Sequence, residues 1–408
     1  MKILHLSDIH MGSSFIHGRT DPVTGRNTRL QDFSDVLRLC IDKAIEQAVD
    51  LVLFGGDAFP DSTPPPYVQE ALGNQFNRLA EKKIPTVLLI GNHDQHSHGQ
   101  GGASLSIYRT LAGNSFIVGD SITTHSISTA SGKIQVTTLP WINRAALVTR
   151  PETEGLSLAE INQLICDKLG VILEQEIRKI DKTMPAILLA HAMVDRATFG
   201  AEKYLAISNK GFQIPLSFFT QPEYDYVALG HVHSHQNLNP TNDPPVVYPG
   251  SIERVDFSEE KEDKGYVIID INQDESSREI NWSFCKLPAR PFKTIKIDVS
   301  KSLDPQSDIE KAVKSQNIKD AVVRLIYQIH PEQCNSINVK LFEELFKEAH
   351  TYSSKPDLIT AKNQQRLPQI GSGNQLTPID ALKIYLENKS ELQDIAQDIL
   401  EAAQNLIS

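Results

Sequence analysis

Five short apolar runs in this chain each end in side chains that bind metal ions. The runs and their endings read KILHLSDIH, DLVLFGGDAF, PTVLLIGNHD, PAILLAH and DYVALGHVH. Each run is typical of a strand buried in a sheet that is covered on both faces. The polar residues follow the carboxyl end of each strand, where open α/β sheets place their ligand sites. The pattern therefore predicts that five loops build one site.

The five endings supply imidazole, carboxylate and amide groups and no cysteine. The candidate residues are Asp8, His10, Asp57, Asn92, His93, Asp94, His191, His231 and His233. Such a mixed donor set suits Mn, Fe or Zn better than Ca or Mg, and the residues leave the choice among the first three open. Two ions about 3.5–4 Å apart can clamp both oxygens of a phosphoryl displacement. A shared carboxylate would lower the repulsion between them, and we predict that Asp57 is that bridge.

The bulk composition limits the protein class without deciding it. A length of 408 residues allows two or three domains, and the four cysteines are scattered without a CxxC pair. No apolar stretch has the length of a membrane span, and the chain enters its first strand at once, so we expect a cytoplasmic protein and no membrane association. The net charge of −11 argues against a nucleic-acid binder. Bound metal ions or a partner could offset that charge.

Periodicity divides the chain into a longer α/β part and a shorter C-terminal part. Helices are predicted over residues 28–49, 67–83 and 157–180, between the buried strands. After residue 290 a small α+β unit is expected, with helices over 304–316 and 336–349. Residues 351–376 are poor in apolar side chains and predict a linker. Residues 377–408 regain a helical apolar face, which can dock a partner or fold back on the chain itself.

The strand endings carry a resemblance to a known superfamily. Asp8-Ile9-His10, Gly56-Asp57, Gly91-Asn92-His93-Asp94, His191 and Gly230-His231-Val232-His233 match the five motifs of calcineurin-like metallophosphoesterases, over roughly residues 1–285. The resemblance implies that one metal is held by Asp8, His10, Asp57 and His233. The second would be held by Asp57, Asn92, His191 and His231. His93 would protonate the leaving oxygen or stabilise the transition state, with Asp94 orienting its imidazole.

Other residues point to one subfamily. Gly56-Asp57 continues as Ala58-Phe59-Pro60-Asp61, without the arginine that grips phosphate in protein phosphatases of this fold. Tyr248–Arg254 and Lys264-Gly265-Tyr266 resemble the segment that closes the nuclease domain of the SbcD family, the nuclease subunit of the DNA double-strand-break repair complex SbcCD. The implied fold is an α/β metallophosphoesterase sandwich of two sheets flanked by helices, plus a small α+β capping domain and C-terminal helices. The implied domains are a nuclease domain (1–288), a capping domain (289–350), a linker (351–376) and partner-docking helices (377–408).

By this resemblance we expect a DNA nuclease, acting as a 3′-to-5′ exonuclease and as an endonuclease, with two divalent metal ions that we take to be Mn. A homodimer and an SbcC-type coiled-coil ATPase partner are also implied. Arg19, Arg26 and Arg29 follow the first motif, where they contact either DNA phosphates or solvent. Two alternatives stay open. One is a phosphodiesterase of the same fold that acts on small molecules or cyclic nucleotides, and the other is a non-catalytic scaffold that docks the ATPase.

Overall fold

The computed structural model describes residues 1–96, 102–111, 115–144, 153–200, 212–273, 278–359, 378–387 and 395–407. The chain divides into two compact units. Unit 1 comprises Met1–Thr294, Ile318–Val323 and Glu348–Tyr352. Unit 2 comprises Ile295–Asn317, Arg324–Lys347 and Ser353–Ser408.

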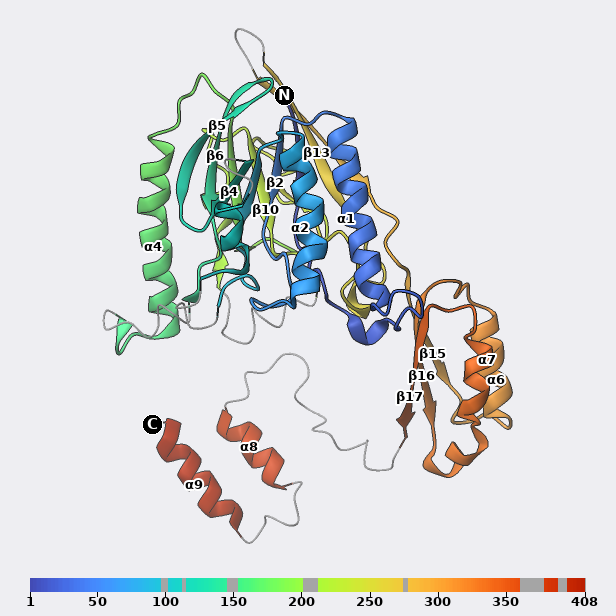
Figure 1. Cartoon of the computed structure of the whole chain (residues 1–408). Coiled ribbons are helices and arrows are strands. Elements are labelled where there is room, and N and C mark those ends of the chain that lie inside the picture. Colours follow the sequence, from blue (N-terminus) through green and yellow to red (C-terminus); the bar gives the residue numbers. More distant parts are fainter. Residues whose placement is uncertain are drawn as a thin grey trace. The chain divides into compact units, whose positions relative to one another are not determined.

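Unit 1 contains two six-stranded sheets (Figure 1). The first has the order β14-β13-β1-β2-β3-β4, with β1 (Lys2–Leu6), β2 (Leu51–Phe54), β3 (Thr86–Leu89), β4 (Phe116–Gly119), β13 (Gly265–Gln273) and β14 (Arg278–Lys286). The second has the order β11-β12-β10-β7-β6-β5, with β5 (Thr123–Thr129), β6 (Gly132–Leu139), β7 (Ala186–His191), β10 (Tyr226–Gly230), β11 (Gln236–Asn237) and β12 (Val246–Tyr248). A separate parallel pair joins β8 (Met193–Val194) to β9 (Gln213–Ile214).

The central strands of both sheets are parallel, and this decides where the polar strand endings lie. Strands β1 to β4 run parallel in the first sheet, as do β6, β7, β10 and β12 in the second. Antiparallel strands pair with these blocks at their outer sides. Because parallel strands end at the same edge, the loops after β1, β2 and β3 are neighbours, and so are those after β7 and β10.

Alternating side chains along the strands build three apolar layers. Ile3 of β1 packs between the two sheets, whereas Leu4 and Leu6 pack against α1 (Thr28–Glu46) and α2 (Pro66–Glu81). The opposite face of the second sheet packs against α4 (Leu158–Ile177), whose first turn is closed by a capping box of Ser157 and Glu160. Both sheets are therefore rigid supports for the loops at their edges.

The structure confirms the predicted α/β sandwich of two sheets flanked by helices. The three helices predicted in this part begin and end within a few residues of α1, α2 and α4. Short 3₁₀ helices complete unit 1: η1 (Phe15–His17), η2 (Ser104–Arg109), η5 (Leu216–Phe218) and η6 (Phe257–Glu259). No helix in the described part of the chain is long and apolar enough to cross a membrane.

A three-stranded sheet, most of whose residues belong to unit 2, agrees with the predicted small α+β unit. Its order is β15 (Phe292–Asp298), β16 (Val322–Ile329), β17 (Thr351–Leu358), with α6 (Pro305–Lys314) and the single turn α7 (Phe342–Leu345). The same unit holds η7 (Pro331–Ser336) and η8 (Val339–Leu341), and then α8 (Pro378–Glu387) and α9 (Ala396–Ile407).

Two predictions in this region are wrong. The predicted helix over 336–349 is replaced by η8 and α7, because the Asn338 side chain accepts a hydrogen bond from the Lys340 N–H and so starts a new turn inside the predicted helix. Part of the predicted linker, residues 351–358, is the strand β17. Its side chains are mostly exposed, so it lacks the apolar pattern by which strands are recognised. Residues 360–376 of that linker lie outside the described residues.

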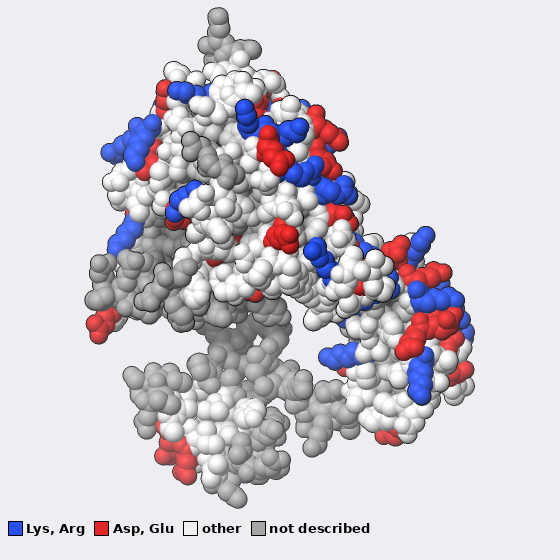
Figure 2. All heavy atoms as spheres, in the orientation of Figure 1, with Lys and Arg blue, Asp and Glu red and all other residues white. Residues whose placement is uncertain are grey.

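Charged side chains of both signs are mixed on the face drawn in Figure 2. Lys and Arg lie beside Asp and Glu over the described residues of each unit. Ion pairs within one helix also occur, such as Arg38 with Asp42 in α1. Exposed pairs of this kind contribute little to stability. On this face the two signs neutralise each other locally instead of forming a basic track.

Candidate metal centre

All nine candidate residues lie at the carboxyl ends of five strands, eight of them in the loops that follow. Asp8 and His10 follow β1, and Asp57 follows β2. The remaining loops place Asn92, His93 and Asp94 after β3, His191 at the end of β7, and His231 and His233 after β10. The first sheet thus supplies six residues and the second sheet three, and the two sets face each other at one edge of the sandwich.

The backbone of the centre is strained at four candidate ligands. Asp8, His10, Asp57 and His231 have φ values of 52°, 48°, 57° and 103°. Residues other than glycine rarely adopt positive φ, and each such position costs about 1–3 kcal/mol. Backbone hydrogen bonds between loops hold this conformation: the Asp8 N–H donates to the Gly56 carbonyl and the His10 N–H to the Asp57 carbonyl, both at 3.0 Å. The loops after β1 and β2 therefore position each other.

Two glycines allow the loops to come this close. Gly56 has a φ of 98°, and a Cβ atom there would lie 2.6 Å from the His191 Nδ1 atom. A Cβ atom on Gly91 would collide with the Asp57 carboxylate and lie 2.6 Å from the Asp57 backbone nitrogen. A side chain at either position would push a candidate ligand out of place.

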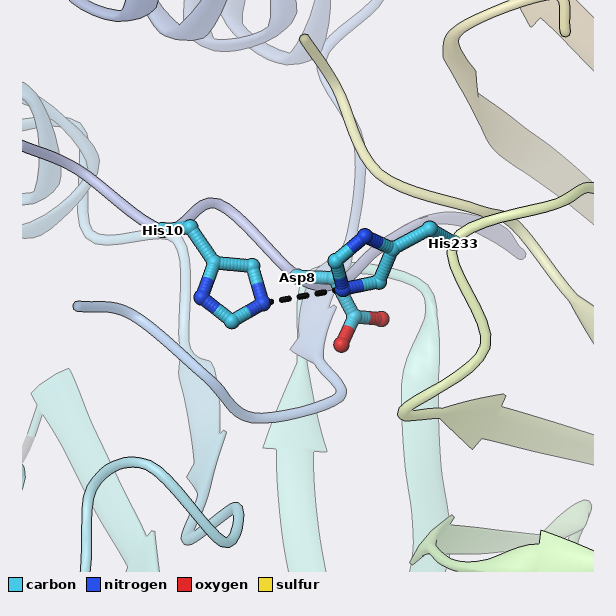
Figure 3. Close-up of side chains that lie close together, drawn as sticks. All are labelled: Asp8, His10 and His233. Atoms are coloured by element: carbon cyan, nitrogen blue, oxygen red, sulfur yellow. Dashed lines mark hydrogen bonds between the residues drawn. The ribbon is translucent and has the colours of Figure 1, made fainter. Parts of the chain in front are cut away.

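Asp8, His10 and His233 form the first cluster of the centre (Figure 3). One potential ligand atom from each residue lies within 4.8 Å of the other two. The Nε2 atoms of His10 and His233 face each other at 3.0 Å. Both Asp8 carboxylate oxygens accept a hydrogen bond from the His231 N–H at 3.1 Å, which fixes that carboxylate beneath the two rings.

Asp57, His191 and His231 form the second cluster, also within 4.8 Å. The Asn92 Oδ1 atom lies 3.0 Å from His191 Nε2 and 2.8 Å from His231 Nδ1, so Asn92 belongs to the same cluster. The Asp57 Oδ2 atom lies 3.4 Å from His191 Nε2 and 3.8 Å from His10 Nε2. This one oxygen therefore reaches both clusters, as a bridging carboxylate must.

Burial and mutual contacts set the protonation of the ligands. Burial lowers the pKa of His10 and of His231 well below the ordinary value, which favours the neutral imidazole that metals bind. Burial also opposes the ionised form of Asp57, but the adjacent His191 outweighs this and holds the Asp57 pKa well below its usual range. Burial alone would lower the pKa of His191, yet the Asp57 carboxylate raises it to about 9. A cation would take the place of the proton shared by this pair.

The donor set fits divalent cations. His191 Nε2 and His231 Nδ1 converge on the Asn92 Oδ1 atom, at 3.0 and 2.8 Å, where a cation would satisfy all three atoms. The opposed nitrogens of His10 and His233 would likewise be satisfied by a cation between them. These features, with two carboxylates and an amide oxygen nearby, match the nitrogen and oxygen shells of Mn, Fe and Zn.

The structure corrects the role of Asp94. Its Oδ2 atom accepts hydrogen bonds from the N–H groups of Asp57 (2.8 Å) and Gly91 (2.9 Å), and its Oδ1 atom accepts from Ala58 N–H and Ser104 Oγ (both 3.1 Å). The His93 Nδ1 atom instead donates to the Pro60 carbonyl at 2.7 Å. The prediction that Asp94 orients the His93 imidazole is therefore wrong. Asp94 joins the loops after β2 and β3, and so supports the backbone of Asp57.

Replacing Asp94 with alanine is expected to destabilise unit 1 by about 3 kcal/mol, because three buried N–H groups would lose their acceptor. Urea unfolding of the metal-free protein, followed by tryptophan fluorescence, measures this. Trp141 and Trp282 are the chain's two tryptophans, and both lie in unit 1. Asp61→Ala is the matched control in an exposed turn and should cost at most about 1 kcal/mol. Equal costs for both variants would contradict the loop-joining role.

Sequence reasoning missed two groups around the centre. Trp141 stacks on His231, with ring centroids 4.8 Å apart and planes inclined by 29°. Glu259 lies in η6 and its Oε1 atom is 2.7 Å from His233 Nδ1. No spacing rule links Glu259 to His233, because the contact depends on the fold of the segment between β12 and β13. For Trp141 the sequence shows only an aromatic side chain, and nothing in it indicates that the ring stacks on His231.

Arg29 is a further correction. It is fully buried at the start of α1, and its guanidinium contacts the Asp32 carboxylate at 2.7 Å, Glu253 at 3.4 Å and the Arg254 carbonyl at 2.6 Å. Neither a DNA phosphate nor solvent is its partner. Arg29 instead fastens α1 to the segment after β12.

The chain is similar to several known proteins. Residues 1–235 match the family model described as calcineurin-like phosphoesterase. The SbcD subunit of the nuclease SbcCD from Staphylococcus epidermidis is 24% identical over 371 residues, which cover 88% of this chain and 90% of that protein. Similar solved structures include a dimetal phosphatase from Danio rerio (13% identity, 66% of this chain and 92% of that chain, TM-score 0.38). A purple acid phosphatase from yellow lupin has 13% identity, with 66% of this chain and 49% of that chain covered and a TM-score of 0.35.

Proposed function

The chain belongs to the calcineurin-like phosphoesterase family, and from this premise we propose that it is the metal-dependent DNA nuclease subunit of an SbcCD-type complex. The observation that carries the proposal is the pair of ligand clusters joined by Asp57. Phosphodiester hydrolysis is one of the reactions that two cations at such a centre serve. The similarity to the staphylococcal SbcD subunit extends over 88% of the chain, well past the residues that match the family model, and this supports DNA as the substrate.

In this proposal the two clusters each hold one divalent ion, which we take to be Mn. Asp8, His10, Asp57 and His233 hold the first, and Asp57, Asn92, His191 and His231 hold the second. Bound ions of this kind activate water and stabilise the attacking and leaving oxygens. Other groups of the chain orient the ligand side chains. The Gly55 carbonyl accepts a hydrogen bond from His191 Nδ1 at 2.6 Å, which leaves His191 Nε2 as the ligand atom.

His93 is the proposed proton donor to the leaving oxygen. Its Nδ1 atom is held by the Pro60 carbonyl, so its Nε2 atom is left to hold the proton that is transferred. The His93 ring lies edge-on to the His10 ring, with centroids 5.0 Å apart, and the His93 N–H donates to Asp57 Oδ1 at 2.9 Å. These contacts keep the imidazole beside the first cluster, where it can reach a substrate phosphate.

The mixed surface charge supports action within a complex. The net charge is −11, and on the face drawn in Figure 2 charges of both signs are mixed, so this face offers no basic footprint for tight binding of DNA by the chain alone. We propose that the metal ions and a coiled-coil ATPase partner of the SbcC type supply the positive surface, and that the nuclease domain forms a homodimer in the cytoplasm.

The proposed division of labour follows the chain. Residues 1–288 are the nuclease domain and residues 289–350 the capping domain. The linker begins after β17, and α8 and α9 are the docking element for the partner. Both helices have been found where the sequence predicts them, and they contact each other. A tethered helix pair with an apolar face is a common way to occupy a partner's groove.

Hydrolysis is expected to require bound metal and to favour DNA. Linear double-stranded DNA, a small phosphodiester and a cyclic nucleotide are each incubated with the protein in Mn, in Mg, and after EDTA treatment. We expect DNA cleavage in Mn, no cleavage after EDTA, and recovery when Mn is restored. Hydrolysis of the small ester or the cyclic nucleotide alone would favour a small-molecule phosphodiesterase. No hydrolysis of any substrate, with or without the ATPase, would favour the scaffold.

A further inference from the structure

The outer nitrogens of three histidines in the centre are held by different kinds of acceptor. His191 donates from Nδ1 to the Gly55 carbonyl at 2.6 Å, and His93 donates to the Pro60 carbonyl at 2.7 Å. His233 instead faces the Oε1 atom of the Glu259 carboxylate at 2.7 Å. A carboxylate is a stronger acceptor than a neutral carbonyl, so it makes the opposite nitrogen of the ring a better donor to a metal.

Glu259 is held for this contact by buried partners. It is 2% exposed, and its Oε2 atom accepts hydrogen bonds from the Val255 N–H at 3.0 Å and from Lys264 Nζ at 2.7 Å. Lys264 is 1% exposed and also donates to the His233 carbonyl at 3.1 Å. The same Glu–Lys pair thus contacts both the ring and the backbone of His233.

Fold stability alone gives no clear reason for a buried Glu–Lys pair at this place. The desolvation cost of a buried ion pair often equals or exceeds the attraction between its charges, so apolar residues could fill the same space at no loss. The Glu259–Lys264 pair lies behind the candidate ligand His233, where it can orient the His233 ring. With Nδ1–H directed at Glu259, the His233 Nε2 atom keeps its lone pair and points toward His10 and Asp8 (Figure 3).

We propose that Glu259 is a positioning residue for the metal held by Asp8, His10 and His233, and that Lys264 holds the Glu259 carboxylate in place. The inference rests on the proposed metal-dependent function. It predicts that removing an acceptor carboxylate affects the metal affinity of the first site only, because the outer nitrogen of His191 in the second cluster is held by the neutral Gly55 carbonyl. Removing the Glu259 charge weakens the first site and leaves the second unchanged.

Manganese titration of the metal-free, full-length protein tests the proposal. Calorimetry and the electron paramagnetic resonance of bound Mn²⁺ give the affinity and the number of sites in the wild type, Glu259→Gln and Glu262→Gln. Glu262 is the matched control, because it also pairs with Lys264, at 2.8 Å, and has no hydrogen bond to His233 in the described structure. We expect one of two sites to weaken about 10- to 100-fold in Glu259→Gln, and neither to change in Glu262→Gln.

A second variant separates positioning from folding. Glu259→Gln leaves Lys264 with one carboxylate fewer in a buried place, which can destabilise the protein. The double variant Glu259→Gln with Lys264→Met removes both charges and is expected to fold while keeping the weakened site. Wild-type affinity at both sites in either folded variant would overturn the inference, as would equal weakening by Glu262→Gln. If the wild-type protein bound no Mn²⁺, this result would contradict the proposed metal-dependent function itself, and the role of Glu259 with it.

Discussion

Asp57→Asn is expected to remove at least one of the two metal ions and to lower phosphodiester hydrolysis by at least about 1,000-fold. The Asp57 Oδ2 atom reaches His191 Nε2 at 3.4 Å and His10 Nε2 at 3.8 Å, so this carboxylate oxygen lies between the two clusters. Asparagine keeps the size of the side chain and an acceptor for the His93 N–H. It lacks the negative charge that offsets two cations, and several kcal/mol of transition-state stabilisation is lost with it.

Metal content by elemental analysis and the hydrolysis rate on the same preparation measure this effect. Asp50→Asn is the matched control: Asp50 is also a buried aspartate that accepts two backbone hydrogen bonds, from Lys2 and Ser131, away from the centre. It should keep both metals. Two metals per chain in Asp57→Asn would rule out the bridging assignment, whatever the rate.

His93→Ala is expected to keep both metals and to lower DNA cleavage by about 100- to 10,000-fold, the usual contribution of a general acid. The His93 imidazole is not one of the assigned ligands: its Nδ1 atom donates to the Pro60 carbonyl, its ring packs edge-on against His10, and the contact to Asp57 comes from the His93 backbone. The metal clusters should therefore survive the substitution, which elemental analysis checks.

The choice of substrate distinguishes proton donation from charge stabilisation by His93. A p-nitrophenyl phosphodiester has a leaving oxygen that needs no proton, so its hydrolysis should fall much less than that of DNA. An equal loss on both substrates would instead mean that the imidazole stabilises the transition state by charge. His125→Ala serves as a control for the loss of a half-buried histidine outside the centre and should change neither rate. Full DNA cleavage by His93→Ala would remove His93 from the mechanism.

The buried strands and their ligands could be predicted because both are local features. A strand covered on both faces must be apolar throughout, and the polar residues after it stand out against it, as in the runs before Asp8 and Asp57. The amphipathic helices were found for the same reason. Strand β17 and the segment over 336–349 were mispredicted because an exposed edge strand and a single buried helical turn have no clear period.

Contacts between distant segments could not be predicted. The acceptors in the centre are chosen by loops that approach one another only in the folded chain, so Asp94 serves backbone N–H groups of two loops and Pro60 serves His93. Arg29 and Glu253 lie far apart in the sequence and form a buried pair. The residues next to a carboxylate or a guanidinium in the sequence do not show whether that charged group is paired in the interior or exposed to solvent.

The sequence by itself determined the chemistry expected of this protein: which candidate ligands follow which strand, in what order, and the metal-dependent phosphoester hydrolysis that they predict. Only the tertiary structure decided how they work together. It placed one oxygen of Asp57 between two clusters, forced four ligands into left-handed backbone, and set Glu259 behind His233. Ligand types are a property of single strand ends, whereas their mutual geometry depends on how two sheets and the loops between them pack.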